Sequence, residues 1–191
     1  MKYIILLRGI NISGKNKISM NELKQELENL GYSNVITHLN SGNIIITTNK
    51  KEEEIISAVR KMIKNKFSLD IPVFVIKSQD LEELVANKPS WWNTKNKEIY
   101  NNIIFILKPH TFKEISEALG KLNNENEQIK EYKNNIFWSY KLSEYRKTNW
   151  WSKTASTNIK DFVTIRTGNT ILKLIELAKG ENKWTKKKST N

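Results

Sequence analysis

Apolar and polar residues follow two different periods along the first eighty positions of the chain. Residues 3–7 form an uninterrupted apolar run, as expected for a strand that is covered on both faces. Ser19 and Glu22 have the spacing of a capping box, and the apolar residues that follow recur at helical spacing up to Gly31. The pattern then predicts strands over residues 35–40 and 44–48, a helix over residues 52–66 and a last strand over residues 71–76. The predicted order is β-α-β-β-α-β.

A weaker copy of this order follows in the second half of the chain. Thr111 and Glu114 repeat the capping-box spacing at the start of a helix, and Asn134 with Asn135 separates the two runs of a hairpin. Strands are predicted over residues 102–107 and 162–166, and the two hairpin strands over residues 128–133 and 136–140. A candidate helix covers residues 142–153, and a final helix covers residues 170–179. We therefore expect an α+β fold of two tandem ferredoxin-like halves, each an antiparallel sheet with helices on one face.

The expected division of the chain follows from this repeat. The first ferredoxin-like half covers residues 1–80, and the second half covers residues 99–180, including the C-terminal helix. A polar linker with two adjacent tryptophans occupies residues 81–98. Residues 181–191 are expected to form a loose basic tail.

The composition limits the cellular setting more than the function. The 191 residues include no cysteine, which excludes disulfides and thiolate metal sites and suits a reducing compartment. No apolar run approaches the roughly 20 residues that span a bilayer. The apolar run at the start of the chain is also too short for a signal peptide. We therefore expect a cytoplasmic protein that does not associate with membranes.

The net charge of +12 raises the question of nucleic-acid binding. Lysines and arginines that neutralise phosphates supply most of non-specific nucleic-acid affinity. Here the excess is spread along the whole chain and lysine dominates, which favours a solvated surface over a dedicated binding face. Non-specific nucleic-acid binding through the lysine-rich surface stays open but is not favoured. Because arginine is scarce, we expect the planar guanidinium to matter at Arg8 and Arg166, which lie in the motifs described next.

Three segments together resemble a known family. They are LLRGINISGKNKISMNELKQELENLGY from residue 6, VITHLNSGNIII from residue 35 and TIRTGNTILKLIELA from residue 164. This set is similar to the bacterial family called domain of unknown function 1697, and the resemblance extends over nearly the whole chain. It implies a pair of ferredoxin-like units and brings no activity. Where the family pattern has asparagine and tryptophan after the arginine, this chain has Thr167 and Gly168, whereas Arg166, Asn169 and Thr170 match.

Two of these segments are expected to meet in space. In a β-α-β-β-α-β unit, the loop after the first strand and the connection between the second and third strands emerge at the same end of the sheet. That end would gather a guanidinium, two amides and a hydroxyl, from Arg8, Asn11, Asn43 and Ser41. With the backbone donors of nearby glycines, such a set suits a phosphate or a carboxylate.

The third segment has the same polar character. Arg166 ends a predicted strand, and Asn169 and Thr170 lead into the last helix, whose free N-terminal amides can hold an anion. The structural alternative is that these residues are helix caps, tight turns and a salt-bridging arginine. The leading hypothesis is a small anionic ligand, such as a phosphorylated one, bound at the junction of the halves by Arg8, Asn11, Ser41, Asn43, Arg166, Asn169 and Thr170. A non-catalytic scaffold or partner-binding module is a further alternative.

Catalytic candidates are sparse, so it stays open whether the protein is an enzyme. His38 lies in a strand that leads to Ser41 and is the only candidate general base, although a structural histidine is the simpler interpretation. His110 is expected in a loop before a helix cap. No pair of histidines has the spacing of metal ligands, and no metalloprotease, serine-hydrolase or phosphate-loop motif occurs. We expect no metal site and no cofactor.

Aromatic residues offer one test of RNA binding. RNA-recognition modules of this topology stack bases on aromatic side chains of their first and third strands. The third strand of the first half is aliphatic, whereas the second half has Phe137, Trp138 and Tyr140 in that place. Packing in the core is the favoured interpretation of these residues and of the pairs Trp91–Trp92 and Trp150–Trp151, with a pocket lined by the tryptophans as the alternative.

Overall fold

The computed structural model of the chain describes residues 1–94, 96–122, 125–156 and 158–180, and it contains two compact units. One unit comprises residues 1–82 together with the segment that starts at Asn169, and the other comprises residues 83–168. Residues 181–191, which were expected to form the basic tail, lie outside the described residues. Among the described helices, none is long and apolar enough to cross a membrane.

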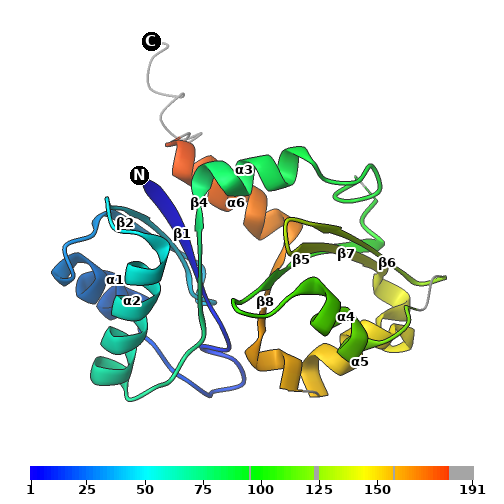
Figure 1. The fold of residues 1–191 in the computed structure, drawn as a ribbon, viewed down its shortest axis with the longest axis horizontal. Helices are drawn as coiled ribbons and strands as arrows, with labels where there is room; N and C mark the ends of the chain where they lie inside the picture. Colours follow the sequence, from blue (N-terminus) through cyan, green and yellow to red (C-terminus); the bar gives the residue numbers. More distant parts are fainter. Residues whose placement is uncertain (95, 123–124, 157, 181–191) are drawn as a thin grey trace, which may run out of the picture. The chain divides into compact units, whose positions relative to one another are not determined.

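The first unit has the predicted order of elements (Figure 1). The elements are β1 (Lys2–Leu7), α1 (Met20–Asn29), β2 (Ser33–His38), β3 (Asn43–Thr47), α2 (Glu52–Phe67) and β4 (Val73–Lys77). Every neighbouring pair of strands is antiparallel, and their spatial order β2-β3-β1-β4 is that of a ferredoxin-like sheet. Ser19 caps α1 as its sequence predicted, because its hydroxyl accepts a hydrogen bond from the backbone of Glu22 at 3.4 Å.

Both faces of this first sheet are buried. Ile5 of β1 belongs to the core cluster that includes the buried residues of α1 and α2. Its neighbours Ile4 and Leu6 point to the opposite face and are also buried, which explains the uninterrupted apolar sequence of β1. Helix α6 (Gly168–Lys179) reaches this opposite face, where the side chain of Lys2 donates a hydrogen bond to the carbonyl of Ala178.

We expected the final helix in the second half, whereas the structure groups it with the first unit. Two contacts at its C-terminal end are made with residues of the first unit. The Lys2 ammonium bonds to the last turn of α6, and Lys179 forms a 3.0 Å ion pair with Glu82 of α3 (Ser78–Ala86). Helix α3 also occupies the start of the segment that was expected to be a linker, because it begins directly after β4.

The second unit repeats the fold with the strand order β6-β7-β5-β8, again antiparallel throughout. Its elements are β5 (Ile99–Ile106), α4 (Phe112–Leu119), β6 (Glu127–Tyr132), β7 (Asn135–Lys141), a 3₁₀ helix (Leu142–Lys147), α5 (Asn149–Ser156), a second 3₁₀ helix (Asn158–Asp161) and β8 (Val163–Thr167). The expected α+β fold of two ferredoxin-like halves is therefore confirmed. The candidate helix at residues 142–153 is interrupted at Thr148, where the 3₁₀ helix ends and α5 follows.

Candidate functional site

The loop after β1 and the β2–β3 connection meet at one end of the first sheet, as the topology predicted. The side-chain amide of Asn11 joins them by donating to the carbonyls of Asn40 and Ile18, each at 2.9 Å. Its oxygen accepts the backbone N–H of Ile18, also at 2.9 Å. Three of the hydrogen-bonding positions of this amide are thus engaged within the protein. Asn11 holds the two loops together.

Asn43 and Ser41 have a similar positioning role in the β2–β3 connection. The fully buried amide of Asn43 donates to the carbonyl of His38 and to the hydroxyl of Ser41, both at 2.9 Å. These bonds close the turn between the strands. The amides predicted to bind a ligand are therefore used to fix the backbone on which other groups are presented.

The loop from Arg8 to Ile18 contains a small hairpin with an unusual backbone. Lys15 donates its backbone N–H to the carbonyl of Ile12 at 2.9 Å, around a turn in which Ser13 and Gly14 have φ angles of 49° and 75°. Two positive φ angles in succession are characteristic of the type I′ hairpin turn. Positive φ angles also occur at three further positions of the loop, Gly9, Asn11 and Asn16. This loop therefore has a defined backbone conformation.

The loop after β1 and the β2–β3 connection carry charges of one sign. Residues 8–21 contain Arg8, Lys15 and Lys17 and no acidic residue, and residues 32–51 contain no acidic residue either. His38, half-buried at the end of β2, adds a group that can become cationic. Burial, and after it the charge of Lys173 in α6, lowers the pKa of His38 below its ordinary value of 6.5. Lys173 itself forms a 3.0 Å ion pair with Glu176, so its charge is partly compensated.

The remaining predicted ligand-binding residues belong to β8 and α6. Asn169 and Thr170 are in the first turn of α6, which already begins at Gly168. Arg166 belongs to the second unit, on β8, and only 9% of it is exposed. Its guanidinium donates to the Thr164 hydroxyl and to the carbonyl of Ile165, both at 2.9 Å. The structure therefore brings Arg8, Asn11, Ser41 and Asn43 together within the first unit. Arg166 is buried in the second unit.

The structure also places the other candidates for chemistry. His110 lies in the loop before α4, as predicted, with its ring stacked on Phe162 at 3.8 Å between ring centroids. Among the described residues, no three histidine, aspartate or glutamate side chains gather as a metal site. Trp138 and Tyr140 belong to the core cluster of the second unit, and Phe137 is fully buried beneath Trp92. Core packing of these three aromatic residues is confirmed, so β7 presents no stacking surface for bases.

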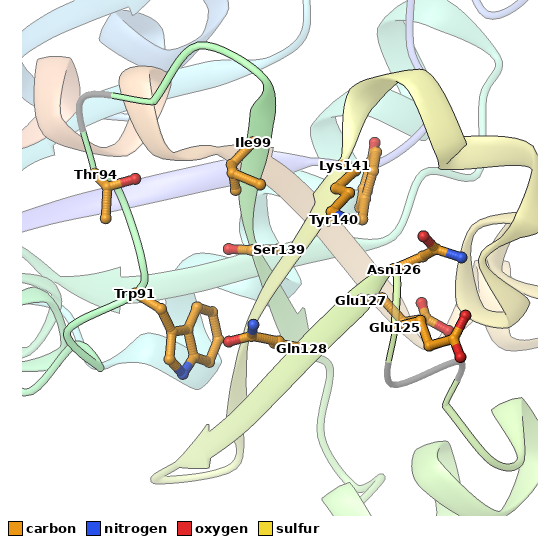
Figure 2. A pocket seen from close by; sticks show the side chains of 10 residues that line it. All are labelled: Trp91, Thr94, Ile99, Glu125, Asn126, Glu127, Gln128, Ser139, Tyr140 and Lys141. Carbon is orange, nitrogen blue, oxygen red and sulfur yellow. The ribbon is translucent and has the colours of Figure 1, made fainter.

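A pocket in the second unit includes Trp91, in agreement with the alternative that the sequence left open for the paired tryptophans. It has a volume of about 200 Å³ and lies beside the sheet formed by β5, β6 and β7. Figure 2 shows Gln128 extending toward the indole of Trp91, and the hydroxyl of Ser139 on the same side as Trp91 and Thr94. The paired tryptophans in the sequence were the available signal. The sequence did not indicate which of the two tryptophans lines a pocket.

Comparisons with known proteins place the chain in a family without an assigned activity. The family model described as "Protein of unknown function (DUF1697)" matches residues 1–137. No curated protein matches the chain. The chain is similar to the solved structure of the conserved bacterial protein SP0830 from Streptococcus pneumoniae, with a TM-score of 0.82 and 26% sequence identity over 93% of this chain and 98% of that one. The protein thus belongs to the DUF1697 family of proteins of unknown function.

Proposed function

We propose that the first unit binds a small anion, such as the phosphate or carboxylate group of a metabolite, at the end of its sheet. The site consists of the loop from Arg8 to Ile18 and the β2–β3 connection that Asn11 joins to it. The single observation that carries this proposal is the local charge. Two segments that meet in space supply Arg8, Lys15, Lys17 and His38 without one acidic residue.

The backbone of the loop supports the same proposal. Successive N–H groups in turns that contain left-handed residues form concave sites for anions. The loop has five residues with positive φ between positions 9 and 16, namely Gly9, Asn11, Ser13, Gly14 and Asn16. A guanidinium beside such a turn adds a planar, two-point contact for phosphate or carboxylate oxygens. Asn11 and Asn43 contribute by holding the loops, and Ser41 by accepting from Asn43.

The proposal predicts that removing two loop cations weakens anion binding. We expect the double variant Lys15→Ala/Lys17→Ala to bind inorganic phosphate, pyrophosphate and ribose 5-phosphate roughly tenfold more weakly, because each exposed ion pair contributes about 0.2–1 kcal/mol. Arg8→Lys, which keeps the charge and loses the planar fork, should also weaken binding. Isothermal titration at constant ionic strength measures these affinities.

The matched control removes the same charge from the second unit. Lys113→Ala/Lys160→Ala takes two exposed lysines from α4 and the second 3₁₀ helix. If this control weakens phosphate binding as much as the loop variant does, diffuse charge is responsible and the loop site is rejected. RNA or DNA affinity that falls steeply with salt and equally in both variants would instead favour the lysine-rich surface. Unchanged melting temperatures with every probe would favour a scaffold.

A second prediction concerns the protonation of His38. Because the folded-state pKa lies below 6.5, the fold favours neutral His38, and its contribution to stability is lost as the pH falls below 6.5. A bound anion nearby should stabilise the imidazolium and raise this pKa. We therefore expect sulfate, which stays doubly charged, to bind more tightly at pH 5.5 than at pH 7.5. The histidine signals in NMR titrations, with and without sulfate, report the shift directly.

His110 is the internal reference for this titration because it lies in the second unit. Sulfate should move the titration midpoint of His38 upward and leave that of His110 unchanged. The variant His38→Gln should remove the corresponding pH dependence of sulfate binding. Equal shifts at both histidines would show a general ionic-strength effect and would contradict binding at this end of the sheet.

A further inference from the structure

We propose that the second unit has a separate binding site, in the pocket beside Trp91, for a small planar heterocycle that carries N–H donors. This site is distinct from the anion site because it lies wholly within residues 83–168. Its side chains come from the turn before β5, from the segment that leads into β6, and from β5, β6 and β7 (Figure 2). Four features of these residues define the ligand: the orientation of the strands, the support of Trp91, the direction of the hydrogen bonds and the charge.

The strand register explains why polar side chains line this pocket. Residues directly opposite each other on antiparallel strands point to the same face of a sheet. Ser139 of β7 lies opposite Gln128 of β6, and Lys141 of β7 lies opposite Ile99 of β5. Tyr140 and its cross-strand partner Glu127 point to the other face, toward the core that the second unit forms with α4 and α5, and they also border the pocket. The pocket therefore combines the polar face that carries Ser139 and Gln128 with residues of the core face.

The backbone that carries Trp91 is anchored by the two residues that follow it. The indole of Trp92 is buried and donates its N–H to the carbonyl of Asn102 at 2.8 Å. The backbone N–H of Asn93 donates to the side-chain oxygen of Asn101 at 2.9 Å. With both following residues fixed to β5, the backbone of the half-buried Trp91 is restricted before any ligand arrives. A preorganised indole is a suitable platform for stacking a planar ring.

The hydrogen bonds of Ser139 select the polarity of the ligand. Its hydroxyl donates to the side-chain oxygen of Asn101 at 2.7 Å. A hydroxyl has a single donor, so the oxygen of Ser139 can offer only lone pairs to the pocket. The nearby exposed carboxylate of Glu125 also offers only acceptors when ionised. The amide of Gln128 supplies both a donor and an acceptor. A ligand that fits must therefore present N–H groups at its edge.

Charge and size separate this ligand from a phosphorylated one. Besides Tyr140, the ionisable side chains that line the pocket are two glutamates and one lysine, Glu125, Glu127 and Lys141. Glu127 already accepts from the indole of Trp138 and from the backbone of Asn149, at 3.2 and 3.0 Å. An excess of carboxylates disfavours phosphate, and about 200 Å³ is less than the space that drug-sized ligands occupy. An amino-substituted base without its phosphate matches both limits.

Adenine is a suitable probe, titrated against the full chain by ligand-observed NMR. We expect binding that weakens roughly tenfold in Trp91→Ala, in line with the usual loss when a stacking aromatic is removed. Binding of N6,N6-dimethyladenine, which lacks the exocyclic donor, should also be weaker. Trp151→Ala is the matched control, because Trp151 is 39% exposed and does not line the pocket. Gln128→Leu provides a second test through an exposed side chain.

The proposal is overturned if Trp91→Ala and Gln128→Leu both keep the wild-type affinity for adenine. Equal affinities for adenine and its dimethylated form would reject the requirement for the exocyclic donor. Stronger binding of a monosaccharide such as glucose than of adenine would reject the heterocycle and indicate a sugar site. Loss of adenine binding in Lys15→Ala/Lys17→Ala, with Trp91→Ala unaffected, would assign adenine to the first unit and reject the second site. Retained phosphate binding in Trp91→Ala would keep the two sites distinct.

Discussion

Replacement of Trp92 by alanine is expected to lower the free energy of unfolding by about 3–5 kcal/mol, as usual for a large aromatic removed from a core. Only 1% of this residue is exposed, and its ring packs edge-on against Phe137 with 5.2 Å between centroids. The substitution would also leave the buried carbonyl of Asn102 without the indole donor that now lies at 2.8 Å. Urea titration followed by NMR signals of the second unit measures the change.

Trp91 provides the control for this experiment because it is the adjacent tryptophan and is only half-buried. Trp91→Ala should cost much less stability than Trp92→Ala, although both remove the same side chain. Signals of the two units should be followed separately, because a chain with two compact units need not unfold in one step. Equal losses for the two variants would contradict the assignment of Trp92 to the core and of Trp91 to a pocket wall.

Most of the fold could be predicted from local signals in the sequence. The Ser19–Glu22 and Thr111–Glu114 patterns marked helix starts that the structure contains at those places, and in both the cap side chain accepts the expected backbone N–H. Uninterrupted and alternating apolar runs located the strands. These signals are reliable because capping and burial are properties of a few neighbouring residues. The strand order then followed from the topology.

The elements that were misplaced depend on distant contacts. Helix α6 contacts Lys2 and Glu82 of the first unit, which are remote from that helix in the sequence. No local pattern could show it. The interruption at Thr148 likewise involves tertiary structure, because Trp150 of α5 donates its indole N–H to the carbonyl of Gly120 at 3.0 Å. This bond ties the start of α5 to the end of α4.

The candidate site was predictable in its location but not in the use of its residues. Topology alone brought the loop at Asn11 close to the β2–β3 connection, and the bond from Asn11 to Asn40 agrees with that expectation. The sequence could not show that the Asn11 and Asn43 amides are occupied by backbone groups, because an amide motif is the same whether it binds a ligand or a loop. The pocket at Trp91 depends on which of two neighbouring tryptophans is buried.

Gly42→Ala is expected to lower the free energy of unfolding by about 2–4 kcal/mol, because it combines a strained backbone with a steric clash. Gly42 has a φ of 74°, and a Cβ atom there would lie 2.6 Å from the Cβ of Leu7. Leu7 cannot retreat easily, since its backbone N–H donates to the carbonyl of Gly42 at 2.8 Å.

The glycine at position 9 separates the two causes of this loss. Its φ is 68° and a Cβ atom there would meet nothing within 4 Å, so Gly9→Ala carries only the backbone strain, about 1–2 kcal/mol. Thermal melts and urea titrations of the two variants should therefore differ by the contribution of the contact with Leu7. Because this contact sets how closely the β2–β3 connection approaches β1, Gly42→Ala should also weaken phosphate binding more than Gly9→Ala does. Equal stability of Gly42→Ala and Gly9→Ala would mean that the β2–β3 connection can move away from β1. The anion site would then lack the fixed backbone on which its proposed affinity depends.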